Sequence, residues 1–210
     1  MIIDMHMHEM RYSGDSFLRL ENMVEIAKRR GLDGICITDH DSMGLKEFAA
    51  EYSEKTGFPI FVGIEFYSLQ GDIVAFGIED YPKERIPAQE FVDLVQAQGG
   101  MCFSAHPFRN NNRGLEENLK IVKGLDGIEV LNGSTLYEAN RKAAEYAAEL
   151  GLATVGSREI RSVQELIRSV KRCETLPVYY KEGGYYLWDM KNPIDAPFHI
   201  YEQEQMVCAG

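Results

Sequence analysis

The chain has 210 residues, 45% of them hydrophobic and 26% charged, which is a globular composition and excludes a disordered or fibrous protein. Lysine and arginine number 22 against 33 acidic residues, so the net charge is −11. This balance argues against non-specific binding to a nucleic-acid polymer and against an anionic membrane surface, because both depend on basic patches. A phosphate ligand remains compatible with it if a metal ion supplies the local positive charge.

In chain order, short apolar runs predict strands and amphipathic stretches that end in glycine predict helices. We expect a strand at 2–7, a helix at 17–30 capped by Ser16 or Asp15, a strand at 34–38, a helix at 45–56, and strands at 59–64 and 73–77. Further on we expect a helix from 87 to the glycines at 99 and 100, a strand at 101–105, a short helix at 115–123, a strand at 127–131, a helix at 136–150 and a strand at 152–155. A capping box of Ser162 and Glu165 opens a last helix that ends near 172, and a hairpin of 176–180 with 185–188 closes the series.

This alternation of strands and helices predicts an α/β fold built on a parallel sheet, either open or closed as a barrel. No glycine-rich phosphate loop follows a predicted strand, which weakens the nucleotide-binding alternatives. The stretch 191–210 has little pattern and is expected to be a covering arm or a frayed tail.

The cysteines lie far apart and form no CxxC pair: Cys36, Cys102, Cys173 and Cys208. We expect free, buried thiols and a reducing compartment. The first residues lack the features of a signal peptide, and no apolar run approaches the ~20 residues of a membrane span. The sequence therefore predicts a cytoplasmic protein without a membrane partner, and it leaves the oligomeric state open.

Chemically active side chains gather at the ends of the predicted strands. Four of the five histidines end such strands, and two glutamates lie in others: His6, His8, His40 and His106, with Glu65 and Glu129. The C-terminal ends of parallel strands form the edge where active sites of α/β proteins lie, so we expect these residues to meet. Any one of them alone is more often structural, but together they favour a metal site.

The spacing of His6 and His8 supports this interpretation, because residues two apart in a strand share a face. We expect Asp4 to share that polar face, and the apolar residues Ile3, Met5 and Met7 to pack under helices on the other face. A buried imidazole pair is costly without a partner, and imidazole with carboxylate suits zinc, manganese or iron. Glu65 could bridge two ions about 3.5–4 Å apart, an arrangement that activates water for displacement at phosphorus.

Six short motifs occur in order: DMHMH at 4–8, SGDS at 13–16, ITDHD at 37–41, GIE at 63–65, AHPF at 105–108 and GIEV at 127–130. Over about residues 1–170 the series resembles the polymerase and histidinol phosphatase (PHP) family of metal-dependent phosphoesterases. The resemblance implies a distorted (β/α)7 TIM-like barrel with two or three divalent ions at the C-terminal ends of its strands. We expect one PHP-like domain over 1–210, with the barrel over about 1–190 and an arm over about 191–210.

The resemblance also implies roles for individual residues. The implied metal ligands are His6, His8 and Glu65 for a first ion, Glu65 and His106 for a second, and Asp15 and His40 for a third. Asp72 sits where many members place another histidine and is a further candidate ligand. Glu65 and His106 are the implied catalytic residues. Arg109 is a candidate for binding substrate phosphate, because guanidinium matches phosphate geometry, with a surface salt bridge as the alternative.

One departure from the family pattern affects the function. After the strand at 152–155, members usually continue with Gly-Ser-Asp-x-His, which supplies two further ligands, whereas this chain reads GSREI at 156–160. Either a short segment between Ser157 and Arg158 is missing from the given sequence, or the protein lacks these ligands. Nothing around His199 suggests a replacement.

Three functions follow from these residues. The leading hypothesis is a phosphoesterase that hydrolyses a small nucleotide or sugar phosphate with a metal-activated hydroxide, monoesters being favoured because no basic groove for a polymer is evident. The alternative is a degenerate barrel that binds metal or phosphate without turnover. A hydrolase of C–N bonds is weaker, because no strand carries a lysine placed to bridge two metals.

Overall fold

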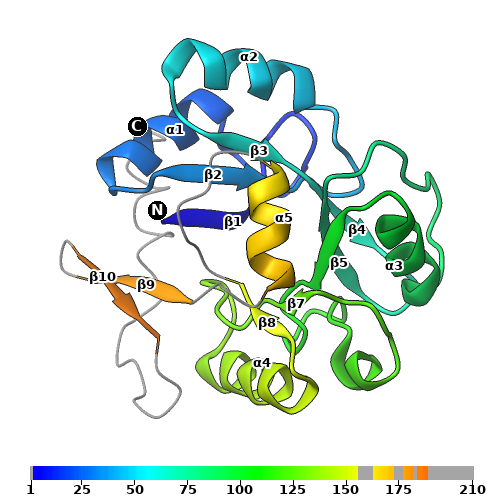
Figure 1. Cartoon of the computed structure of the whole chain (residues 1–210). Coiled ribbons are helices and arrows are strands. Elements are labelled where there is room, and N and C mark those ends of the chain that lie inside the picture. The colour runs from blue at the N-terminus through cyan, green and yellow to red at the C-terminus, as the bar shows by residue number, and fades with distance from the viewer. Residues whose placement is uncertain (1, 156–162, 173–176, 182–183, 189–210) are drawn as a thin grey trace.

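The computed structural model describes residues 2–155, 163–172, 177–181 and 184–188, in which strands and helices alternate as an α/β fold (Figure 1). The first half contains β1 (Ile3–Met7), α1 (Leu20–Arg29), β2 (Gly34–Ile37), α2 (Lys46–Thr56), β3 (Ile60–Val62), β4 (Ile64–Tyr67), β5 (Asp72–Phe76) and α3 (Ala88–Ala97). The second half contains β6 (Met101–Ser104), the 3-10 helix η1 (Glu116–Lys120), β7 (Gly127–Ile128), α4 (Tyr137–Leu150), β8 (Ala153–Thr154), α5 (Val163–Lys171), β9 (Val178–Lys181) and β10 (Gly184–Leu187).

The strands form a sheet of β1-β2-β3, a sheet of β4-β5-β6-β7-β8, and the expected antiparallel hairpin of β9 and β10. The prediction of a parallel sheet is wrong for β5, which runs antiparallel to both β4 and β6. The connection 68–71 between β4 and β5 is too short for a parallel crossover, which needs a dozen or more residues. Within the described residues these pairings do not close into a ring.

The strand expected at 59–64 is divided at Gly63, where the chain passes from one sheet to the other. A Cβ on Gly63 would collide with the carbonyl oxygen of Ala75 and lie 2.7 Å from the ring of Phe76. Beyond this point an isolated parallel bridge joins His40 to Glu65. The break at Gly63 therefore leads the chain directly to a contact between two of the candidate ligands.

A β-bulge interrupts β1. Asp4 pairs with Ile35, but Met7 pairs with Ile37, so the register shifts by one residue between them. Ile3 and Met5 consequently lie in the inner core, where the sulfur atoms of Met5 and Cys36 are 3.8 Å apart, whereas Met7 packs towards α1 and α2. The expectation that all three apolar residues pack under helices is thus wrong for Ile3 and Met5, because a bulge changes which face a side chain takes.

Three apolar clusters fill the molecule. One lies between β2, β3 and the helices α1 and α2, and a second lies between β4 to β7 and the helices α3 and α4. The third joins the inner faces of both sheets to Leu166 and Val170 of α5. Ile167 of α5 approaches Gly77, which follows the last residue of β5. Helix α5 therefore covers the end of the sheets where β5 finishes, away from the end where β5 starts.

Two further expectations need correction. Helix α1 begins at Leu20 rather than at residue 17, and neither Ser16 nor Asp15 caps it; instead the buried carboxylate of Glu9 accepts the N–H of Leu20 at 3.2 Å. The helix expected at 115–123 is the shorter 3-10 helix η1.

The GSREI segment, Ser162, His199 and the arm at 191–210 lie outside the described residues. Of the helices that are described, none has both the length and the apolar character to cross a membrane.

Candidate metal centre

The predicted site residues meet at one edge of the two sheets. His6 lies near the end of β1 and His8 just beyond it, and His40 and His106 follow β2 and β6. Asp72 is the first residue of β5, and it reaches the same edge because β5 runs in the opposite direction. The antiparallel course of β5 thus explains how a strand can deliver a ligand from its beginning rather than its end.

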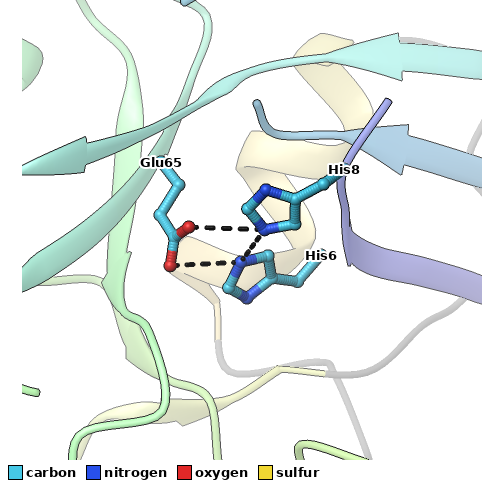
Figure 2. Close-up of side chains that lie close together, drawn as sticks. All are labelled: His6, His8 and Glu65. Atoms are coloured by element: carbon cyan, nitrogen blue, oxygen red, sulfur yellow. Dashed lines mark hydrogen bonds and ion pairs between the residues drawn. The ribbon is translucent and has the colours of Figure 1, made fainter. Parts of the chain in front are cut away.

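Glu65 lies at the centre of this edge, with a side chain that is fully buried. Its two oxygens contact all four imidazoles: Oε1 lies 2.9 Å from His106 Nε2 and 3.2 Å from His6 Nε2, and Oε2 lies 2.8 Å from His40 Nδ1 and 3.3 Å from His8 Nε2. Figure 2 shows the carboxylate facing the rings of His6 and His8. One carboxylate therefore joins ligands from both sheets.

Three overlapping groups of potential ligands result. In each group the ligand atoms lie within 4.8 Å of one another: the first group is His6, His8 and Glu65, the second is Glu65, Asp72 and His106, and the third is His8, Asp15 and His40. All seven residues predicted as metal ligands belong to at least one group. Asp15, which is 60% exposed, reaches the third group by lying 3.1 Å from His40 Nε2.

The atoms within these groups suit a divalent ion. The Nε2 atoms of His6 and His8 are 3.1 Å apart, although only one proton can lie between two ring nitrogens. Glu65 Oε2 is buried beside two imidazoles, yet it accepts no hydrogen bond from any described residue. Buried polar atoms are rarely left without partners, so lone pairs that converge in this way fit a cation. Imidazole and carboxylate donors together suit zinc, manganese or iron.

The protonation states of His8 and Glu65 suit a metal ion. Burial and the neighbouring charge of His6 lower the pKa of His8 to about 4, which leaves this ring neutral near pH 7. Burial acts to raise the pKa of Glu65, but the charge of His6 and the close imidazoles of His106 and His40 together outweigh it and hold that pKa well below the usual range. Neutral imidazole and ionised carboxylate are the forms that bind metals.

The loop after β1 is held by two residues for which the sequence suggested no role. Ser13 Oγ donates to Asp39 Oδ1 at 3.0 Å, and it accepts the N–H of His40, also at 3.0 Å. Asp39 also accepts the N–H of Glu9 at 2.6 Å. These bonds fix the loop that carries Asp15 against His40. Both residues lie inside the motifs at 13–16 and 37–41, and that proximity is the signal that could have identified them.

The two arginines of the loop after β6 differ in position. The Arg109 side chain forms no hydrogen bond or ion pair with a described residue, and its proposed contact with phosphate stays a prediction. Arg113 enters the site: its Nε lies 2.7 Å from Asp72 Oδ2, and its Nη2 lies 2.9 Å from Asp72 Oδ1 and 3.2 Å from His40 Nδ1. The guanidinium also lies 4.4 Å from the centre of the Tyr67 ring. The sequence analysis missed Arg113, because its place depends on how the loop folds back.

An α/β fold that gathers imidazoles and carboxylates at one strand edge is typical of metal-dependent hydrolases. The family model of the PHP domain matches residues 4–206, so the chain belongs to the PHP domain family. This membership confirms the resemblance and places the chain in a family of metal-dependent phosphoesterases and phosphatases.

Relatives of this chain carry general descriptions. An uncharacterized protein of Methanocaldococcus jannaschii is 28% identical over 61% of this chain and 80% of its own length. A "Probable phosphatase" of Caldicellulosiruptor saccharolyticus is 26% identical over 87% of this chain and 78% of its own. The first name states no activity, and the second names a phosphatase without a substrate.

Two solved structures share the fold. A "putative metal-dependent phosphoesterase" of Bifidobacterium adolescentis aligns with a TM-score of 0.62 at 19% identity, covering 73% of this chain and 85% of its own. An amidohydrolase of Chromobacterium violaceum, with bound sulfate, aligns with a TM-score of 0.61 at 19% identity, covering 75% and 87%. At this level of identity the likeness concerns the fold.

Proposed function

We propose that this protein is a metal-dependent phosphoesterase that hydrolyses a small phosphate ester of the nucleotide or sugar phosphate class. The observation that carries the proposal is the convergence of four imidazoles on the buried carboxylate of Glu65. Membership of the PHP domain family supports it.

The three ligand groups would hold two or three divalent ions of zinc, manganese or iron. When bound, such ions supply positive charge for the phosphoryl oxygens and lower the pKa of a water molecule towards neutrality. Glu65 belongs to two groups and fixes their spacing, and His106 Nε2 lies 2.9 Å from it. We therefore assign Glu65 and His106 as the residues closest to the reaction.

Arg113 is placed to bind the substrate. Asp72 and Tyr67 hold its guanidinium in one orientation, and the Nη1 donors, which have no partner among the described residues, could bind phosphoryl oxygens. A guanidinium oriented before binding loses less entropy when it binds an anion. Arg109 is proposed as a second phosphate contact from the same loop.

We also propose that the two sheets belong to one distorted (β/α)7 barrel within a single domain over 1–210. The shared inner cluster supports this arrangement, because side chains from both sheets pack against each other there and α5 covers one end. The carboxylate Glu129, just after β7, lies 3.2 Å from His6 of β1 and so links the first and last parts of the two sheets.

The proposed substrate is small rather than polymeric, because a net charge of −11 offers no general attraction for a nucleic acid. We propose that the protein acts in the cytoplasm without a membrane partner. Cys36 and Cys102 are free and buried, which fits a reducing compartment.

Metal content per chain is the first test, measured by plasma mass spectrometry on protein purified without chelators. Hydrolysis of p-nitrophenyl phosphate and of a panel of nucleotide and sugar phosphates is measured on the same sample. Two or three equivalents, with hydrolysis that stops on chelation and returns on adding metal, are the expected result. One loosely held equivalent or none, with no hydrolysis, contradicts the proposal and indicates a degenerate barrel.

A further inference from the structure

A chain of buried and half-buried polar side chains runs behind the candidate ligands. Asn140 of α4 is 2% exposed, and its side chain exchanges two hydrogen bonds with the backbone of Asn132, at 3.2 and 3.1 Å. Asn132 in turn donates from Nδ2 to Glu129 Oε1 at 3.0 Å. The chain therefore connects a helix on the outside of the sheet to a carboxylate at its functional edge.

Glu129 is 6% exposed and uses both oxygens. Each oxygen lies 3.2 Å from His6 Nδ1, and Oε2 accepts the backbone N–H of His106 at 2.7 Å. Glu129 belongs to none of the three ligand groups. It touches one member of the first group and one member of the second.

The contact with His6 determines which ring nitrogen carries a proton. An ionised carboxylate only accepts hydrogen bonds, so Nδ1 of His6 must be the donor. In the neutral ring the other nitrogen, Nε2, therefore carries the lone pair, and it lies 3.2 Å from Glu65. This is the nitrogen that the first group would offer to a metal.

The contact with His106 acts on the backbone. His106 has a φ of +27°, a conformation that residues other than glycine rarely adopt. Such conformations persist only where the surroundings hold them, and the hydrogen bond to Glu129 is a buried constraint at that position. The same carboxylate therefore supports the backbone from which the His106 ring reaches Glu65.

We propose that Glu129 is a positioning residue that fixes the tautomer of His6 and the backbone of His106, and so prepares one ligand of the first group and one of the second. This inference rests on the proposed function, because prepared ligands matter only if ions bind. Removing a carboxylate that orients a metal-bound histidine typically lowers metal affinity 10–100-fold, and we expect a loss on this order when Glu129 is changed.

Glu129→Gln tests the proposal with little change in size. A backbone N–H cannot reorient, so the glutamine oxygen must face His106, and its amide group must then face His6 and Asn132. The amide group can donate to Nδ1 only when the ring proton lies on Nε2, where it removes the lone pair from the metal. The glutamine oxygen keeps a single 3.2 Å contact with Nδ1, so the preference for a proton on Nδ1 is weakened. Packing alone would be preserved in this variant.

Asp126→Asn is a matched control at the other end of the same strands. Asp126 Oδ2 accepts the N–H of Cys102 at 2.9 Å and a hydrogen bond from Gln96 Nε2 at 3.1 Å, so it also joins a β6 amide to a side-chain amide. It touches none of the candidate ligands among the described residues. The control therefore carries the same chemical change far from the metal centre.

The measurement is zinc affinity, by competition with a chromophoric chelator, on the full chain of each variant. We expect Glu129→Gln to weaken the tightest zinc site about 10–100-fold and Asp126→Asn to change it less than about twofold. Equal zinc affinity in Glu129→Gln and wild type contradicts the inference and leaves the proposed function standing. A wild-type protein that binds no zinc, manganese or iron contradicts both.

A second readout does not depend on how well the variant folds. Long-range ¹H–¹⁵N spectra of the zinc-loaded wild-type protein report which nitrogen of His6 carries the proton. We expect the proton on Nδ1, and in folded Glu129→Gln protein we expect a larger fraction of it on Nε2. A wild-type His6 that carries its proton on Nε2 overturns the proposal, whatever the variant does.

Discussion

Arg113 and Asp72 are joined through both side chain and backbone. The guanidinium donates to the two carboxylate oxygens at 2.7 and 2.9 Å, and the carbonyl of Arg113 accepts the N–H of Asp72 at 2.6 Å. Asp72 is fully buried. The pair places a fixed cation beside His40, at an edge otherwise lined by imidazoles and carboxylates.

Removing the guanidinium of Arg113 should affect both stability and substrate binding. Arg113→Met leaves a buried carboxylate without its partner, and we expect a loss of about 2–3 kcal/mol, below the usual 3–5 because Arg113 is 29% exposed. Urea denaturation measures this loss, and steady-state kinetics should show a higher KM for the phosphate ester.

Arg109→Met is the comparison for Arg113→Met, since Arg109 lies in the same loop without a described side-chain partner. We expect its stability to change by less than about 0.5 kcal/mol, with an effect confined to KM. Similar stability losses in the two variants would contradict the stabilising role that we assign to the ion pair of Arg113 with Asp72.

Glu65→Gln should abolish metal-dependent hydrolysis. The substitution keeps the volume of the side chain but replaces the charge that faces four imidazoles with a neutral amide. Because bound ions contribute several kcal/mol to transition-state stabilisation, we expect kcat/KM to fall at least about a thousandfold. His8→Ala, which removes a ligand shared by two groups, should do the same. Metal content and kcat/KM check both variants, and full activity in either would refute the site.

Much of this edge could be predicted from the sequence, because apolar runs mark strands and the ends of strands mark the site. His6, His8, His40 and His106 were placed together for this reason, and the structure brings them to one carboxylate. This inference needs only the positions of the strands, and it does not need their side-chain geometry.

Other features leave no trace in the pattern of residues. The run IDMHM alternates in the same way with or without the bulge that moves Met5 into the inner core. The run DIVAF is equally apolar in a parallel and an antiparallel strand, so the direction of β5 could only be inferred from the short connection before it. Arg113 reaches Asp72 from a loop that folds back on itself, in which a Cβ on Gly114 would meet the backbone of Pro107.

Metal removal should lower thermal stability. Ions that bind only the folded chain stabilise it by about 4 kcal/mol when present at a thousand times their dissociation constant. For a chain of this size, that corresponds to a fall of about 10 °C in Tm on chelation. Calorimetry with and without chelator measures the change, and re-addition of metal should restore the original Tm. An unchanged Tm would mean that the folded chain binds no ion tightly.

Gly63→Ala should destabilise the junction between the two sheets. The added Cβ would meet the Ala75 carbonyl and lie 2.7 Å from the Phe76 ring, so the backbone must shift. We expect a loss of about 1–3 kcal/mol, which is typical of overpacking. Gly133→Ala is the control, because a Cβ there meets nothing within 4 Å. Equal midpoints of urea denaturation for the two variants would contradict the prediction.

The distance along the chain between His6 and Glu129 has a consequence during synthesis. These residues are 123 positions apart and touch in the folded protein. At 5–20 residues per second, a ribosome needs roughly 6–25 s to add Glu129 after it has made His6. Throughout that interval His6 lacks the carboxylate that orients its ring. The centre therefore cannot be completed until more than half of the 210 residues have been synthesised.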